Sequence, residues 1–273
     1  MTDRWLAIKV EPSGDPKPVI DALFAAGSQG IQEQGTAIIT HFPPGTSAGE
    51  IESAIRSADA NAEITSELAP AADWSQWRAS VGEHRIGKLT IAPPWMESDD
   101  PMRVIIDPAM AFGTGEHATT RGVVRLMQQL SPMPGRVADL GAGSAVLAIC
   151  AAKLGASRVT AIELDPDAIG NAEENVAANS VTEAVRVIQG DAAVLLPLIS
   201  PVDLILANII SSVLLDLLSP IAESLSEGGH AILSGILAEE REMMTDALTR
   251  AGWRIVSEDV EENWWSVMVR LQQ

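Results

Sequence analysis

The sequence predicts an α/β protein with two folded parts: a small α+β domain, followed by a larger, doubly wound and mostly parallel sheet. Three observations support this fold class. The 273 residues suit one large or two modest domains, and 47% of them are hydrophobic, so a sizeable core can form. Residues 1–68 follow a strand–helix–strand–strand–helix–strand order. From residue 102 to residue 273, strands and helices alternate, which is typical of a parallel sheet covered by helices.

The first 68 residues have the element order of a ferredoxin-like domain. Ser47 followed by Glu50 predicts a capping box at the start of the second helix. The first helix begins with prolines and ends on Gly27. Many functions occur on this fold, so the fold alone predicts none of them. The expected strands are 4–10, 30–35, 36–42 and 62–68, and the expected helices are 16–27 and 47–59.

Residues 69–101 are expected to connect the two domains. Tryptophans are concentrated there, at Trp74, Trp77 and Trp95. We favour the interpretation that they clamp the two domains together. A place beside a substrate groove is the alternative.

Residues 102–273 are expected to form the larger domain. Its last two strands are predicted to form an antiparallel hairpin. The expected strands are 104–108, 136–143, 158–165, 184–191, 202–209, 230–236, 253–264 and 265–272, and the expected helices are 119–130, 144–155, 166–180, 211–229 and 239–252.

The charge of the chain limits its partners. The net charge is −19 and the pI is about 4.5, so the chain should repel phosphate backbones and attract a basic protein. Solubility alone is the other explanation for this charge.

The sequence also limits where the protein can act. The single cysteine, Cys150, excludes an internal disulfide. No apolar run is long enough to span a bilayer, and the first residues lack a signal-peptide pattern. We therefore expect a cytoplasmic protein that binds neither nucleic acid nor membranes directly. A monomer is also expected. The histidines have no metal-ligand spacing, so no metal site is expected.

The segment VADLGAGSAVLAI carries the strongest local signal. A buried strand reaches Asp139, and Gly141 and Gly143 then allow a ligand to approach the backbone closely. The third glycine of a dinucleotide fingerprint is replaced by Val146, so a pyrophosphate fits poorly. An acid followed by such a turn suits a ligand with an amino group and a sugar. A tight strand-to-helix turn without a ligand remains the alternative.

Three further polar residues come at the ends of predicted strands. Glu163 follows the glycine turn by about twenty residues, the spacing of an acid that binds ribose hydroxyls. Asp191 either accepts a hydrogen bond from an adenine amino group or caps a helix. Asn208 is either a turn residue or a polar group that faces the site. Ligands bind at the carboxyl ends of strands in open α/β sheets, which favours a common site.

The segments DLGAGSAVLAI, AIELDP and LILANI resemble the S-adenosylmethionine sites of class I methyltransferases, which have a Rossmann-like fold. Residues 112–120, FGTGEHATT, are very similar to the FGTG-x-H-x-TT signature of the PrmA family, whose members methylate the eleventh protein of the large ribosomal subunit. The resemblance extends over nearly the whole chain. It includes the W-x-x-W-R and IGKLTIAPPW segments and the ILSGI strand. One departure is Ala145, because the family usually has a glycine there.

The resemblance implies a cofactor site and a catalytic residue. S-adenosylmethionine is expected to contact Thr120, Gly141, Glu163 and Asn208. Asn208 is also expected to hold the attacking amine and thereby to be catalytic. Gly143 and Asp191 complete the expected cofactor site. His117 is expected to fix its loop by a hydrogen bond, with a catalytic base as the alternative.

The resemblance also implies a reaction and a substrate. The expected reaction is methylation of lysine side chains or the N-terminal α-amine of a basic ribosomal protein, which residues 1–68 capture. A methyltransferase for another protein or a small amine is the second hypothesis. A binding module that has lost turnover is the third hypothesis, and the methyl group of Ala145 is its motivation.

Overall fold

The structure is a computed structural model that describes residues 4–14, 16–28, 31–34, 37–42, 45–70, 82–96, 99–107 and 115–272. The chain divides into two compact units, residues 1–81 and 82–273. The range 69–101, which was expected to be a connector, falls partly in each unit.

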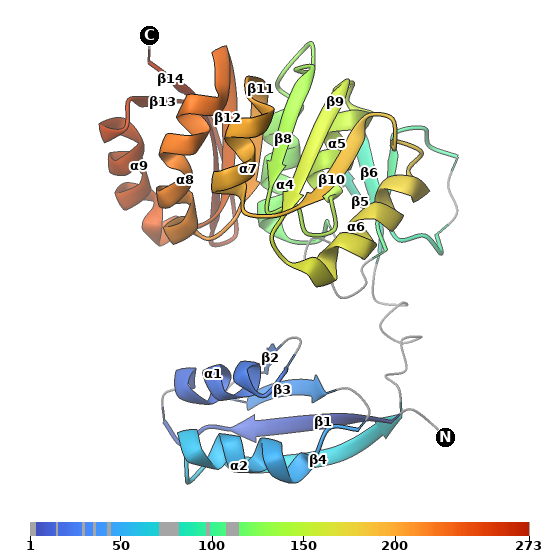
Figure 1. Ribbon diagram of the computed structural model, residues 1–273, viewed down its shortest axis with the longest axis vertical. Coiled ribbons are helices and arrows are strands. Elements are labelled where there is room, and N and C mark those ends of the chain that lie inside the picture. Colours follow the sequence, from blue (N-terminus) through green and yellow to red (C-terminus); the bar gives the residue numbers. More distant parts are fainter. Residues whose placement is uncertain are drawn as a thin grey trace. The chain divides into compact units, whose positions relative to one another are not determined.

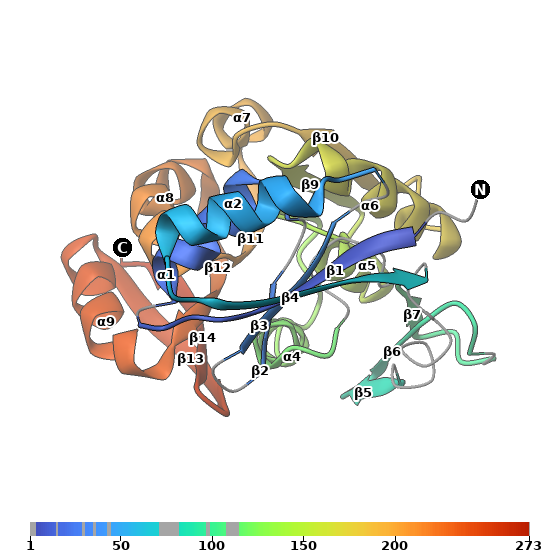
Figure 2. The same ribbon diagram turned by 90° about the horizontal axis from the view of Figure 1, so that it is seen from below.

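The first unit has the predicted order of elements. Its sheet has the strand order β2-β3-β1-β4, in which all neighbouring strands are antiparallel. Both helices pack on one apolar core and lie on the same face of the sheet (Figure 2). The elements are β1 (Arg4–Glu11), α1 (Lys17–Ala25), β2 (Ile31–Gln34), β3 (Ala37–Phe42), α2 (Ala48–Ala58) and β4 (Glu63–Pro70). This topology is the predicted ferredoxin-like arrangement.

Sequence periodicity explains the core of the first unit. Alternate residues of β1, at positions 6, 8 and 10, are buried, as the twofold repeat of a strand requires. Ile51 and Ile55 lie one turn apart on α2 and are both buried. Ser47 occupies the N-cap position of α2, but its side chain makes no capping hydrogen bond to the described helix. The predicted capping box was therefore wrong in its contacts, although the start of the helix was right.

The second unit contains a seven-stranded sheet with the order β10-β9-β8-β11-β12-β14-β13 (Figure 1). Neighbours from β10 to β12 are parallel, whereas β14 is antiparallel to both β12 and β13. This confirms the mostly parallel sheet with a C-terminal hairpin. The strands are β8 (Arg136–Leu140), β9 (Arg158–Glu163), β10 (Val185–Gln189), β11 (Val202–Asn208), β12 (Leu225–Leu237), β13 (Trp253–Glu261) and β14 (Trp264–Leu271).

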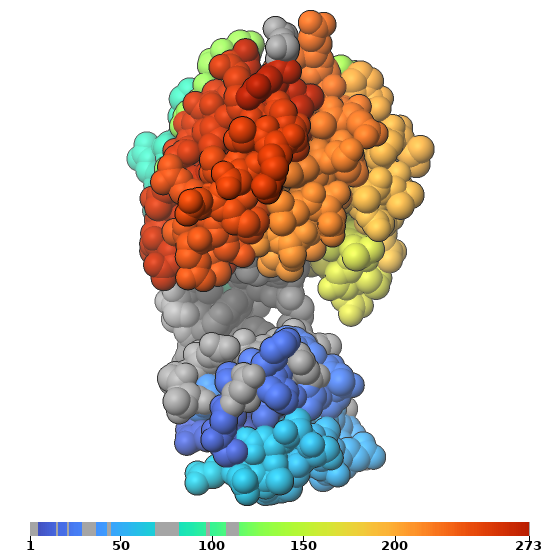
Figure 3. Space-filling model, turned by 90° about the vertical axis from the view of Figure 1, so that its left-hand side faces the viewer, coloured from blue at the N-terminus to red at the C-terminus, as the bar shows by residue number. Residues whose placement is uncertain are grey.

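Helices cover both faces of this sheet. Residues of α4, α5 and α6 share one buried cluster with the sheet, and residues of α7, α8 and α9 share a second cluster. The C-terminal segments, coloured orange to red, form a continuous surface of this unit in Figure 3. The helices are α4 (Ala118–Met127), α5 (Val146–Lys153), α6 (Pro166–Ala178), α7 (Ala192–Ile199), α8 (Ser211–Ser224) and α9 (Arg241–Arg250), the last preceded by a short 3-10 helix, η1 (Ala238–Glu240).

The structure adds elements that the sequence reading lacked. Helix α7 was not predicted, and α8 ends at Ser224, earlier than expected, because β12 already begins at Leu225. Strands β5 (His84–Ile86), β6 (Leu89–Ala92) and β7 (Arg103–Ile105) form a small three-stranded sheet with β6 in the middle. The first two of these strands lie in the range that was expected to be a connector. Trp74 and Trp77 lie outside the described residues, so their expected clamping role stays a prediction.

Candidate functional site

The carboxyl ends of β8, β9, β10 and β11 lie side by side at one edge of the large sheet. Leu140 of β8 pairs in register with Ile162 of β9 and with Ala207 of β11, and Gln189 of β10 pairs with Glu163. Each predicted acid, the glycine turn and the predicted asparagine follow or end one of these four strands. The structure therefore gathers them at the position where open α/β sheets bind ligands.

The glycine turn after β8 has the backbone that the sequence predicted. Gly141 and Gly143 have φ angles of +65° and +52°, a region that side chains make costly. A Cβ atom on Gly141 would lie 3.0 Å from Cγ1 of Ile209, so a side chain there would crowd the residue that follows Asn208. The amides of Gly141 and Ala142 both donate to the carbonyl oxygen of Ile162, at 2.9 and 3.1 Å. The turn is thus tied to β9 before α5 begins.

Asp139 is a buried carboxylate with one free oxygen. It is 1% exposed, and its Oδ2 accepts a hydrogen bond of 2.9 Å from the amide of Ala148. Its Oδ1 has no hydrogen-bond partner among the residues that the structure describes. Burial raises the pKa of Asp139, the hydrogen bond from Ala148 lowers it, and the nearby Glu163 raises it; together they bring the pKa to about 7. A buried polar atom normally has a partner, so a ligand cation or donor would complete this site.

This carboxyl group predicts a pH dependence of stability in the absence of ligand. The pKa of Asp139 is about 7 in the folded chain and about 3.9 when unfolded, so the folded state binds the proton more tightly. The contribution of Asp139 therefore lowers stability as pH rises from about 4 to about 7, and it stays constant above that. Chemical denaturation between pH 5 and 8 should show a less negative slope for Asp139→Asn than for the wild type. Equal slopes would contradict the buried, ionising carboxyl group.

Glu163 ends β9 and already holds the glycine turn. Its Oε2 accepts from the amide of Gly143 at 2.7 Å, and its Oε1 accepts from the amide of Asp165 at 2.9 Å. Each carboxylate oxygen has a second lone pair, so these two bonds leave room for two more donors. Glu163 is therefore fixed in position before any hydroxyl group binds to it.

Asp191 follows β10 and caps α7. Its side chain is exposed and accepts from the amide of Ala193 at 2.8 Å. The helix-cap interpretation is confirmed. Contact with an adenine amino group stays a prediction, and the second oxygen of the carboxylate is the group available for it.

Asn208 ends β11 beside the first turn of α4. Its Nδ2 lies 3.5 Å from Oγ1 of Thr120, a long and weak hydrogen bond. Thr120 is fully buried, whereas Asn208 is partly exposed. The two residues are 88 positions apart in the chain, and the fold brings them together as the resemblance implied.

His117 is the N-cap residue of α4. The amide of Thr119 donates to Nδ1 of His117 at 3.4 Å, and Oγ1 of Thr119 lies 2.7 Å from the same nitrogen. The imidazole ring packs edge-on against Trp264, with ring centroids 4.9 Å apart. Burial lowers the pKa of His117 and Arg121 lowers it further, whereas Glu262 raises it; the net lowering favours the neutral ring. These contacts support the interpretation that His117 fixes the loop. The preceding residues Phe112 to Thr114 lie outside the described part of the chain.

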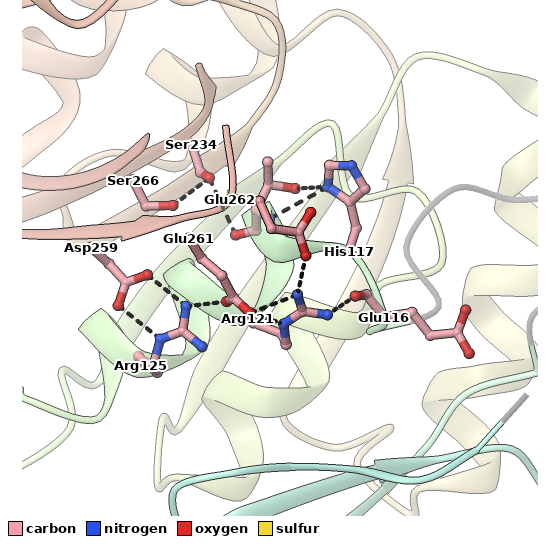
Figure 4. A network of polar contacts seen from close by, with 10 residues as sticks. Glu116, His117, Arg121, Arg125, Ser234, Asp259, Glu261, Glu262 and Ser266 are labelled. Carbon is pink, nitrogen blue, oxygen red and sulfur yellow. Dashed lines mark hydrogen bonds and ion pairs between the residues drawn. The ribbon is translucent and has the colours of Figure 1, made fainter. Parts of the chain in front are cut away.

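A polar network that the sequence reading missed holds α4 against the C-terminal hairpin (Figure 4). Arg125 makes a two-point ion pair with Asp259, at 2.7 and 2.6 Å. Nε of Arg121 donates to Glu261 at 2.9 Å, and its Nη1 donates to the carbonyl oxygen of Glu116. The two arginines are spaced by four along a helix and the two acids by two along a strand, so each pair presents one face. Two-point arginine–carboxylate pairs are stronger and more directional than single contacts.

Close backbone packing supports the same helix. A Cβ atom on Gly122 would lie 2.3 Å from Oγ of Ser266, so any larger residue at this position would force Ser266 or the helix to shift. Ser266 lies 2.7 Å from Ser234, whose hydroxyl donates to the carbonyl oxygen of Thr119 at 3.2 Å. All three of these hydroxyl-bearing residues are buried. The first turn of α4, which carries Thr120, is therefore held from two sides.

Within the described residues, no group of three or more histidine, cysteine, aspartate or glutamate side chains could hold a metal ion. The described helices also include none that is long and apolar enough to cross a membrane.

The chain is similar to known proteins over most of its length. A family model described as ribosomal protein L11 methyltransferase (PrmA) matches residues 14–272. The ribosomal protein L11 methyltransferase of Exiguobacterium sibiricum is 40% identical over 203 residues, which are 72% of this chain and 64% of that protein. The corresponding protein of Bacillus cereus is 33% identical over 264 residues, 91% of this chain and 84% of that protein.

Solved structures show the same likeness. A ribosomal protein L11 methylase from Lactobacillus delbrueckii subsp. bulgaricus has a TM-score of 0.64 and 30% identity, and the match covers 70% of this chain and all of that one. The tRNA m1G37 methyltransferase of M. jannaschii has a TM-score of 0.52 over 98% of this chain, but its 12% identity shows only a shared fold. The matches with the first relatives span 64% to 65% of their length.

Proposed function

The chain belongs to the ribosomal protein L11 methyltransferase (PrmA) family, and on this premise we propose that it transfers methyl groups from S-adenosylmethionine to amino groups of ribosomal protein L11. One observation carries the proposal: Asp139, the glycine turn, Glu163 and Asn208 meet at a single edge of the sheet. The amino groups are lysine side chains, the N-terminal α-amine, or both.

The residues at this edge fit S-adenosylmethionine. The free Oδ1 of Asp139 suits the ammonium group of the methionine part, directly or through a water molecule. Glu163 has lone pairs left for the two ribose hydroxyls, and the backbone at Gly141 and Gly143 lets the ligand come close. Asp191 lies at the end of the next strand, where it would accept from the adenine amino group. We propose these contacts because the residues match positions of the family's cofactor site.

The bound cofactor supplies an electrophilic methyl group on a positively charged sulfur. The task of the protein is therefore alignment and exclusion of water. The amine must be neutral to attack, which is harder for lysine, with a pKa near 10.4, than for an α-amine near 7.7–8.0. Because Nδ2 of Asn208 faces Thr120, its Oδ1 is available to accept a hydrogen bond from the amine. This contact would orient the amine lone pair, and the amine proton would then pass to solvent.

The substrate assignment rests on the family and on charge. A chain with a net charge of −19 attracts a basic protein, and a ribosomal protein is a suitable partner. We assign capture of L11 to the ferredoxin-like unit, residues 1–68, and methyl transfer to the second unit. The chain is proposed to act as a cytoplasmic monomer without direct contact to nucleic acid.

Intact-mass spectrometry tests the proposed function. Purified L11 is incubated with the protein and S-adenosylmethionine, beside a sample of L11 whose amines have been acetylated. We expect mass increases of one or more methyl groups on L11 and none on acetylated L11. No mass increase on L11, from a preparation that binds the cofactor by calorimetry, would refute the substrate. Methylation of acetylated L11 would refute transfer to amines.

Ala145, where the family usually has a glycine, provides a prediction about the glycine turn. Its φ angle is +63°, and its methyl group is fully buried in the apolar cluster of α5. Glycine would relieve about 1–2 kcal/mol of left-handed strain. It would also lose about 0.8 kcal/mol of methyl burial and about 0.4–1 kcal/mol through the unfolded chain. We expect Ala145→Gly to change the free energy of unfolding by less than about 1 kcal/mol.

The same variant tests whether Ala145 crowds the cofactor. A methyl group that belongs to the core leaves the affinity for S-adenosylhomocysteine, the reaction product, within about threefold of the wild type, which is less than 1.4 kcal/mol. Isothermal titration calorimetry measures this affinity. Tenfold tighter binding by Ala145→Gly would show that the methyl group does reach the cofactor.

A further inference from the structure

Three asparagines form a ladder along one face of α6. Asn171, Asn175 and Asn179 are spaced by four residues, so they lie one above another on the helix. Asn175 is 2% exposed and Asn179 is 4% exposed. Buried amides are kept in proteins only when their donors and acceptors are satisfied, so the partners of this ladder are informative.

The side-chain amide of Asn179 makes the hydrogen bonds to β7 that a residue of a neighbouring strand would make. The amide of Ile105 in β7 donates to its Oδ1 at 2.8 Å, and its Nδ2 donates back to the carbonyl oxygen of Ile105 at 2.6 Å. These two bonds reproduce the exchange that a residue of an adjacent strand makes. Asn179 thereby fixes the end of β7, and it does not touch the glycine turn.

Asn175 joins two segments that lead to the candidate site. Its Oδ1 accepts from the amide of Asp107 at 2.8 Å, and its Nδ2 donates to the carbonyl oxygen of Ser144 at 3.1 Å. The remaining proton of Nδ2 faces Oδ1 of Asn171 at 3.3 Å, and Nδ2 of Asn171 donates to the carbonyl oxygen of Asp107, also at 3.3 Å. Every polar atom of the Asn175 side chain is thus used.

The hydrogen bond from Asn175 to Ser144 reaches the glycine turn of the candidate site. Ser144 is fully buried and directly follows Gly143, whose amide binds Glu163. The Asn175 amide therefore holds the glycine turn at Ser144, next to the Gly143 amide that Glu163 holds. A shift of the Ser144 carbonyl would move the Gly143 amide and, with it, the Glu163 carboxylate.

We propose that Asn175 is a positioning residue of the cofactor site, which sets the glycine turn for S-adenosylmethionine by hydrogen bonds to Ser144 and Asp107. The inference rests on the proposed function. It gives Asn175 a role that differs from that of Asn179, although both are equally buried on the same helix. A role in stability alone would make the two asparagines equivalent.

Two matched substitutions separate these roles. Asn175→Asp keeps an acceptor for the Asp107 amide but removes the donor to Ser144 and Asn171. Asn179→Asp keeps an acceptor for the Ile105 amide but removes the donor to the carbonyl oxygens of Ile105 and Asn175. Both should lower the thermal stability. By calorimetry with S-adenosylhomocysteine, Asn175→Asp should raise Kd about tenfold through the lost buried bond to Ser144, and Asn179→Asp should raise it less than about threefold. Hydrogen exchange without ligand should become faster at the amides of residues 143–146 only in Asn175→Asp.

Equal Kd values for the two variants, or unchanged exchange in residues 143–146 of Asn175→Asp, would overturn the inference. If Asn175→Asp does not fold, Asn171→Ala at the partly exposed end of the ladder replaces it. That variant removes the acceptor for the second Nδ2 proton of Asn175, so hydrogen exchange at the amides of residues 143–146 should become faster, and unchanged exchange would equally overturn the inference. A wild-type protein that fails to bind S-adenosylhomocysteine would instead refute the proposed function.

Discussion

Replacing Asn208 by alanine should abolish most of the methyl transfer while the cofactor still binds. The side-chain oxygen of Asn208 is proposed to orient the attacking amine, and misplacement of a reacting group by about 1 Å costs roughly 100-fold in rate. We therefore expect kcat for L11 methylation to fall by about 100-fold or more in Asn208→Ala. The affinity for S-adenosylhomocysteine should change by less than about tenfold, because the other cofactor contacts remain. Initial rates and calorimetry measure the two quantities.

Thr120→Val tests how much the hydrogen bond between Thr120 and Asn208 contributes to the rate. Valine keeps the shape of the buried threonine but removes the oxygen that faces Nδ2 of Asn208. Because that bond is long and weak, we expect kcat to fall by less than about tenfold. Full activity of Asn208→Ala would contradict the role of Asn208. A larger loss in Thr120→Val than in Asn208→Ala would show that Thr120, rather than Asn208, is the residue that matters.

Replacing Glu163 by glutamine should weaken cofactor binding more than any other single change at the sheet edge. Glutamine removes the charge and places an amide nitrogen against one of the two backbone donors, Gly143 or Asp165. Hydrogen bonds to a charged group contribute about 1.5–3 kcal/mol each, so Kd for S-adenosylhomocysteine should rise by about 10-fold to 100-fold. Calorimetry on the full chain measures the change.

The control for this variant is Asp165→Asn. It removes a charge two residues away, but an asparagine retains the cap on the Asp167 amide that Asp165 provides. Its Kd should stay within about threefold of the wild type, a difference below 1.4 kcal/mol. If both variants weaken binding equally, then the local charge, and not the carboxylate of Glu163, governs affinity.

The sequence predicted most strands and helices because their patterns are regular. Strand β8 and helix α5 meet at glycines, and α6 begins at Asp165 and Pro166 with a clear cap. Helix α7 was missed because AAVLLPLI is a continuous apolar run with a proline inside, and periodicity cannot separate a helix from a strand in such a run. Strands β5 and β6 have three and four residues, too few to show an alternating pattern.

The candidate site was predictable where it depended on strand ends. Glu163 and Asn208 follow apolar strands, and a parallel sheet brings such ends together without further information. The contacts that support the site were not predictable in this way. Arg125 meets Asp259 across 134 positions, and Asn175 meets Asp107 across 68 positions. Such pairings depend on the packing of α4 and α6 on the sheet, and no local pattern in the sequence encodes them.

A crystal structure of the protein with S-adenosylhomocysteine tests the central claim most directly, namely that the carboxyl ends of β8 to β11 form the cofactor site. The account predicts the ligand at this edge. Its amino group should lie within hydrogen-bond distance of Oδ1 of Asp139, or be bridged to it by one water molecule. Its ribose hydroxyls should contact Glu163. A ligand bound elsewhere on the chain, or one at this edge that touches neither Asp139 nor Glu163, would contradict the account.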